Sequence, residues 1–162
     1  MKNRIVPKRD YGERNIAFSP ANVVHMQAGL KDDLIGNSIL LMIGCGLRPG
    51  EVIALCRSDI SPDGGKINVS KSALSQGTVH AKSCRVVTVR GEYWQMVARH
   101  LRARGKSENE YIWKGDDPDK TISLSEFRRL YYDALNDIGD VPHMSLHACR
   151  NTYFTLFSAK NE

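Results

Sequence analysis

The sequence has no long hydrophobic run and no hydrophobic N-terminal segment. Its longest strongly apolar stretch, residues 39–45, is far shorter than the roughly 20 residues that a helix needs to cross a lipid bilayer. The first ten residues, MKNRIVPKRD, lack the apolar core of a secretory signal peptide. We therefore expect no membrane partner and no export.

The sequence also lacks the paired cysteines of zinc sites and disulfide scaffolds. Its four cysteines contain no CxxC pair, so we expect reduced thiols that pack as small apolar groups. Four of the histidines show no spacing typical of metal ligands, and we expect neither a metal ion nor a cofactor. These residues are Cys45, Cys56, Cys84 and Cys149, and His25, His80, His100 and His143.

Acidic residues are nearly missing between residues 66 and 106. This segment carries nine Lys or Arg and one acid, Glu92, a net charge of +8, whereas residues 107–141 carry nine acids and four bases, a net charge of −5. A local excess of positive charge attracts polyanions and releases their counterions. Nucleic acid is therefore the leading candidate partner, and a solvated basic surface is the alternative that charge alone leaves open.

The length and the residue pattern indicate one mixed, mainly helical domain. A chain of 162 residues suffices for a single sizeable core. Apolar residues at helical spacing, with capping residues at the ends, predict several helices, and three short β-type runs predict a small three-stranded antiparallel sheet. The expected fold class is α+β. The predicted helices are 19–29, 33–45, 49–56, 94–105, 123–139 and 145 onward, and the predicted strands are 66–70, 78–81 and 85–89.

Two arginines occur in segments that otherwise have the composition of a protein interior. Arg48 follows a Gly-Leu pair between two apolar helices, and Arg150 lies in the apolar last helix, three residues after His147. A guanidinium group cannot lose its charge, so its burial requires an anion. Glu51 is a candidate partner for Arg48, whereas Arg150 has no acid nearby in the sequence. An external anion such as a phosphodiester is therefore favoured for Arg150.

The segments around these arginines resemble the tyrosine recombinases, the phage-integrase family. LLMIGCGLRPGEVIALCRSDI (residues 40–60) is similar to the first arginine box, with its Gly-Leu-Arg-x-x-Glu core, and SLHACRNTYFT (145–155) is similar to the second box, His-x-x-Arg. Between them, INVSKSALSQGTVHAKSCRVVTV (67–89) resembles the lysine-bearing β-hairpin of the family. The resemblance covers residues 17–160 and implies the recombinase catalytic-domain fold.

The resemblance implies a role for each matching residue. Arg48 and Arg150 would bind the scissile phosphate and stabilise charge in the transition state, and His147 would position the attacking hydroxyl or accept its proton. Lys82 would protonate the leaving 5′-oxygen, with Lys71 as the alternative hairpin lysine. This chemistry requires no metal ion. The basic residues expected to contact DNA are Lys71, Arg85 and Arg90.

The chain also departs from the family pattern. The family's later His or Trp and its nucleophilic Tyr follow the second box, so we expect both beyond Glu162. The six tyrosines of the chain do not match that nucleophile. We interpret residues 1–16 as a basic linker and residues 17–162 as a partial catalytic domain that also lacks the N-terminal core-binding domain.

The implied function is site-specific DNA recombination or integration of a mobile element, through a 3′-phosphotyrosine in the intact parent protein. That parent would assemble as a tetramer on double-stranded DNA, in the cytoplasm and at the nucleoid of a bacterium or in a phage system. The chain itself is expected to bind DNA without cleaving it. A non-catalytic DNA-binding or regulatory remnant of a recombinase is the alternative, and a small-molecule phosphate-binding enzyme is a third hypothesis.

Overall fold

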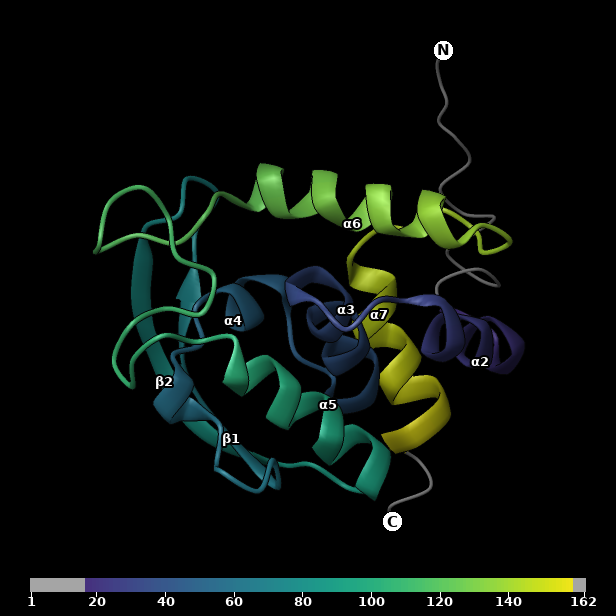
Figure 1. Ribbon diagram of the computed structural model, residues 1–162, viewed down its shortest axis with the longest axis horizontal. Helices are drawn as coiled ribbons and strands as arrows, with labels where there is room; N and C mark the ends of the chain where they lie inside the picture. Colours follow the sequence, from purple (N-terminus) through teal and green to yellow (C-terminus); the bar gives the residue numbers. More distant parts are fainter. Residues whose placement is uncertain (1–16, 159–162) are drawn as a thin grey trace.

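The computed structural model describes residues 17–158, so the predicted linker at residues 1–16 lies outside the described residues. Helix α3 lies at the centre of the molecule, α6 crosses one side of it, and the β1–β2 hairpin lies at the edge opposite α2 (Figure 1). No helix among residues 17–158 is long and apolar enough to cross a membrane. The elements are α2 (Pro20–Gly29), α3 (Leu34–Cys45), α4 (Pro49–Ile53), the 3₁₀ turn Arg57–Asp59, β1 (Lys66–Ala73), β2 (Val79–Thr88), α5 (Glu92–Ala103), α6 (Leu124–Ile138), α7 (His147–Thr152) and the π-helical turn Tyr153–Ser158.

Local capping signals set the ends of the first helices, as the sequence predicts. The Ser19 side chain accepts a hydrogen bond from the Asn22 amide at 3.0 Å and completes a capping box, and the Asp33 side chain accepts one from the Gly36 amide at 2.8 Å. Helix α3 ends at Gly46, whose φ of 75° lies in the left-handed region that glycine adopts without strain. The chain therefore turns sharply after α3 and starts α4 three residues later.

Helix α3 forms the buried centre because it is apolar around most of its circumference. Ile39 and Ile43 lie on one side of the helix and Leu41 on the opposite side, and all three are fully buried. On one side, the Trp94 ring of α5 packs directly against the α3 backbone at Gly44, where a Cβ atom would lie 2.3 Å from the ring. Helix α3 is thus held by its neighbours and provides a fixed base for the corner that follows it.

The sheet has two strands in the described part of the chain, not the three that the sequence predicts. β1 pairs with β2 in one antiparallel hairpin. The runs predicted at residues 78–81 and 85–89 belong largely to the single strand β2, and residues 82–84, which separate them in the sequence, form an irregularity within it. The α+β class, mainly helical with a small antiparallel sheet, is confirmed.

Long-range hydrogen bonds tie the flanking segments to the core. The Phe18 amide donates to the Thr152 hydroxyl at 2.8 Å, which joins the segment before α2 to α7. At the tip of the hairpin, the Thr121 amide donates to the Gly77 carbonyl at 2.9 Å. Both the hairpin and α7 are therefore anchored at points outside their own elements.

Candidate anion-binding site

The corner between α3 and α4 presents Arg48 at the surface and holds Glu51 beneath it. The Arg48 amide donates to Oε1 of Glu51 at 2.9 Å, which fixes the backbone of the corner. The Arg48 Nη1 atom lies 3.4 Å from Oε2 of the same carboxylate, so the ion pair considered from the sequence is present. The Arg48 side chain is 51% exposed, however, and the expectation that it is buried is wrong. Because the corner lies at the surface, this guanidinium can meet an external anion.

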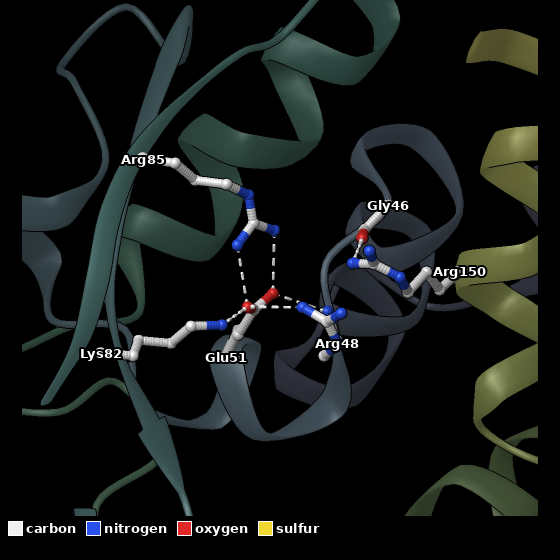
Figure 2. Close-up of polar contacts among 6 residues, drawn as sticks. All are labelled: Gly46, Arg48, Glu51, Lys82, Arg85 and Arg150. Carbon is white, nitrogen blue, oxygen red and sulfur yellow. Dashed lines mark hydrogen bonds and ion pairs between the residues drawn. The ribbon is translucent and has the colours of Figure 1, made fainter. Parts of the chain in front are cut away.

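The Glu51 carboxylate is fully buried and gathers cations from the hairpin (Figure 2). Arg85 donates with both ends of its guanidinium, from Nη1 to Oε2 at 2.9 Å and from Nη2 to Oε1 at 3.0 Å. The Lys82 ammonium group donates to Oε2 as well. Burial alone would raise the pKa of the Glu51 carboxyl, but the hydrogen bonds from Arg85, Lys82 and the Arg48 amide outweigh burial and hold this pKa well below its usual range.

A bulge in β2 explains how Lys82 and Arg85 reach the same carboxylate. Residues three apart on a regular strand point to opposite faces of the sheet. In this hairpin the pairing of Val69 with Arg85 is followed by that of Lys71 with Ala81, so one residue of β1 lies opposite three of β2. The partly buried positions of β2 accordingly recur every third residue on both sides of Lys82. The bulge therefore turns both cations toward α4.

Arg150 reaches the same region from α7, near the end of the described chain. Its Nη1 atom donates to the Gly46 carbonyl at 2.6 Å, and its guanidinium stacks over the Phe154 ring, with 4.9 Å from Cζ to the ring centroid. Desolvation, followed by the nearby charge of Arg48, lowers the pKa of Arg150. Figure 2 shows Arg48, Lys82 and Arg85 around Glu51, and Arg150 beside Arg48, where it binds Gly46.

These residues form what we call the cationic cluster: Arg48, Glu51, Lys82, Arg85 and Arg150. Three of its cations contact the one carboxylate and Arg150 lies nearby on Gly46, which leaves a net charge of plus three. Desolvation and then the charge of Arg48 lower the pKa of Arg150, and the second cause is a repulsion between the two guanidinium groups. An anion bound between them removes that repulsion, and planar guanidinium groups match the oxygens of a phosphate. The cluster is therefore suited to hold a phosphodiester.

The other predicted site residues lie at the edge of the cationic cluster or away from it. Lys71 donates to Asp59 at 2.9 Å. Burial alone would lower the pKa of Lys71, but the hydrogen bond and the charge of Asp59 outweigh burial and raise it. Of the two candidate hairpin lysines, the structure thus brings Lys82 to the cluster and directs Lys71 elsewhere. Arg90 is exposed after β2, and His147 is exposed at the first position of α7, one turn before the cluster arginine of that helix.

Sequence reasoning did not find two contacts of the cluster. The guanidinium of Arg85 is committed to Glu51, 34 positions away, and no sequence signal identifies that pairing; its predicted contact with DNA stays a prediction. The stacking of Arg150 on Phe154 was also missed. A signal for it exists, since a spacing of four residues places both side chains on one face of a helix.

The helices around a central α3 and the flanking hairpin have the tyrosine-recombinase catalytic-domain fold. Among solved structures, the chain is similar to the integrase of the transposon Tn1549 in complex with a circular intermediate DNA, with a TM-score of 0.71 and 14% sequence identity over 99% of this chain and 56% of that chain. It is also similar to the Tn1549 integrase in complex with transposon right end DNA, with a TM-score of 0.70 and 13% identity over 90% of this chain and 54% of that chain.

A third similar structure is the XerA recombinase, with a TM-score of 0.62 and 18% identity over 85% of this chain and 48% of that chain. The chain thus spans about half the length of the solved structures that it matches. No protein-family model matches the chain, and no curated protein matches it. At these identities the similarity establishes the fold.

Proposed function

We propose that the chain is the catalytic-domain part of a site-specific DNA recombinase, which in the intact protein cleaves and rejoins DNA through a 3′-phosphotyrosine. The cationic cluster carries the proposal, because it gathers two arginines from distant segments and a hairpin lysine in one region of the molecule. The shared fold adds support, since the similar structures are an integrase bound to DNA and a recombinase. Such a protein would act on double-stranded DNA of a mobile element in the cytoplasm, where the free thiols stay reduced.

In this proposal Arg48 and Arg150 hold two oxygens of the scissile phosphate. They stabilise the negative charge that grows in the five-coordinate transition state, and losing one such donor raises the barrier by about 2.7–4 kcal/mol. Lys82 gives a proton to the leaving 5′-oxygen. His147 lies one turn before Arg150 on α7 and takes the proton of the attacking hydroxyl.

We further propose that no tyrosine among residues 17–158 is the nucleophile. Tyr131 donates its hydroxyl to the Met144 carbonyl at 2.8 Å, and burial raises its pKa, so it is hard to ionise. Burial also raises the pKa of Tyr93, and the Tyr153 ring lies against Gly46. The chain would therefore bind DNA without cleaving it, while the intact protein would assemble as a tetramer on DNA.

Binding of a random-sequence DNA duplex at several salt concentrations tests the anion site. Arg150→Gln removes one phosphate ligand, so we expect weaker binding and a slope of log affinity against log salt that is smaller by about 0.9. Arg104→Gln is the matched control, because Arg104 binds Asp32 outside the cluster. The control should keep the wild-type slope. Equal slopes for wild type and Arg150→Gln would contradict the site assignment.

A nicked suicide duplex tests the proposed lack of cleavage. We expect the chain to form no covalent adduct with the DNA in denaturing electrophoresis. An adduct formed by the wild-type chain and lost in Tyr153→Phe would overturn this part of the proposal, because it would identify a nucleophile beside the cationic cluster. The result does not affect the DNA-binding part, which the salt series measures separately.

A further inference from the structure

The Glu51 carboxylate is approached by more hydrogen-bond donors than it has lone-pair sites to accept them. Five reach it: the Arg48 amide, Arg48 Nη1, the Lys82 ammonium, and Nη1 and Nη2 of Arg85. A carboxylate offers about four lone-pair sites on its two oxygens. Oε2 alone meets three cationic donors, one from each of the three side chains. At least one of these donors is therefore surplus.

The two hairpin cations hold Glu51 in different ways. Arg85 occupies both oxygens with one planar group that cannot lose its charge. Lys82 donates to one oxygen only, as a compact charge on a flexible stem. Lys82 can therefore leave at a lower cost than Arg85.

Burial decides which cation has to stay. The Glu51 side chain has no exposed surface, and a buried carboxylate without a counterion is strongly destabilising. The bidentate pair with Arg85 meets that requirement without help from Lys82. The hairpin lysine is then free to serve a second anion that approaches from the exposed side of the cluster.

We propose that Arg85 is a positioning residue for Lys82. It neutralises Glu51 permanently, so that Lys82 can exchange this carboxylate for a phosphodiester in the cationic cluster. The identity of the second anion rests on the proposed function. The competition between Lys82 and Arg85 for the Glu51 carboxylate, in contrast, exists in the free protein. Without Arg85, Lys82 becomes the main counterion of the buried carboxylate and stays on it.

The reactivity of Lys82 in the free protein tests whether Lys82 and Arg85 compete for Glu51. Amine labelling with a succinimidyl ester, read by mass spectrometry, reports how often each lysine is unpaired. In Arg85→Gln we expect Lys82 to label about tenfold more slowly than in wild type. Arg85 no longer competes for Glu51, so the Lys82 ammonium group stays hydrogen-bonded to the carboxylate for more of the time. Lys71 serves as an internal control, since its partner is Asp59, and its labelling rate should not change.

Two further variants keep this test decisive. Glu51→Gln removes the charge that holds Lys82, so its labelling should become faster than in wild type. Arg85→Lys keeps the charge without the planar fork and should slow the labelling of Lys82 less than Arg85→Gln does. Faster labelling of Lys71 would reveal that a variant is unfolded. The remaining two of the three variants would then test the proposal. An unchanged rate for Lys82 in the folded variants would overturn the proposal.

A double-mutant cycle on DNA binding separates positioning from direct contact. If Arg85 acts through Glu51, Arg85→Gln weakens DNA binding, and adding Glu51→Gln restores it because Lys82 is released. If Arg85 contacts the phosphate itself, the second substitution brings no rescue, and the positioning role is refuted. If the wild-type chain binds no DNA, the proposed function is wrong. The labelling result still shows whether Lys82 and Arg85 compete for Glu51.

Discussion

At the scale of single residues, the acid of the cationic cluster matters as much as its arginines. Glu51 is the only acidic residue that is buried among residues 17–158. It fixes the Arg48 backbone through one oxygen and receives two side chains of the hairpin. Removing its charge would leave the cations to repel one another, so Glu51 stabilises both the fold and the arrangement of the cluster.

We predict that Glu51→Gln changes how stability depends on pH. Because the folded pKa of Glu51 is depressed, its stabilisation is fully present above the ordinary carboxyl pKa of about 4.3 and is lost as pH falls below it. In urea unfolding at about pH 7, the variant should be less stable by about 1.5–3 kcal/mol, the usual worth of hydrogen bonds to a charged group. At about pH 3 this difference should shrink.

Glu92→Gln is the control for that measurement. The Glu92 side chain is 83% exposed and pairs with Arg99 at 3.4 Å, a surface contact of little worth. This variant should unfold like the wild type at both pH values. A constant difference between wild type and Glu51→Gln across the acid range would show that the depressed pKa does not contribute to stability.

At the scale of elements, the sequence predicts the ends of helices, because residues within one turn determine them. Ser19, Asp33 and Ser123 each cap the helix that follows, and Gly46 ends α3, because capping depends on residues within one turn. The bulge in β2 depends instead on the register between two strands, which no local pattern records. Residues 82–84 therefore lie outside the predicted strands, and no local pattern indicates that the hairpin pairs with Glu51.

The bulge gives an element-scale prediction. Deleting Ser83 and Cys84 together leaves Lys82 next to Arg85 in a regular ladder, so the two side chains point to opposite faces of the sheet. We expect only a modest loss of stability in urea, because the continuous ladder offsets part of the lost hydrogen bond from Lys82 to Glu51. DNA binding should nevertheless weaken, with a salt slope smaller by about 0.9 for one lost phosphate contact.

The double substitution of Ser83 and Cys84 by alanine keeps the length of the bulge and serves as the control. It should retain wild-type stability and DNA binding. If the deletion variant bound DNA as tightly as this control, the direction in which the bulge turns Lys82 would be irrelevant to the site.

At the scale of the whole molecule, the net charge of a sequence segment differs from the charge that the folded segment presents to a ligand. Within the basic segment 66–106, Arg99 donates to the Asp63 carbonyl at 3.1 Å and Arg102 donates to the Ile60 carbonyl at 2.9 Å. These arginines brace the turn before the hairpin. The sequence predicted a basic region correctly in composition, but only folding decides which of its cations remain for an anion.

The meeting of Arg48 and Arg150 is likewise a property of the whole chain. Each box predicts an arginine in an apolar setting, and only the resemblance to recombinases suggested that both serve one phosphate. The structure brings the α3–α4 corner and α7 together through packing of both on the central helix, and the hydrogen bond from Arg150 to the Gly46 carbonyl joins them directly. Local patterns contain no information about such a contact.

The junction between the first and last described segments gives a whole-molecule prediction. Thr152, two residues after Arg150 on α7, is fully buried; its hydroxyl accepts from the Phe18 amide and donates to the Ala148 carbonyl at 2.7 Å. Thr152→Val keeps the shape but leaves the buried Phe18 amide without an acceptor, which should cost about 1–3 kcal/mol in urea unfolding. Thr155→Val makes the same change at an exposed position and should have little effect. Equal stability of the two variants would mean that this junction does not hold α7, and with it Arg150, in place.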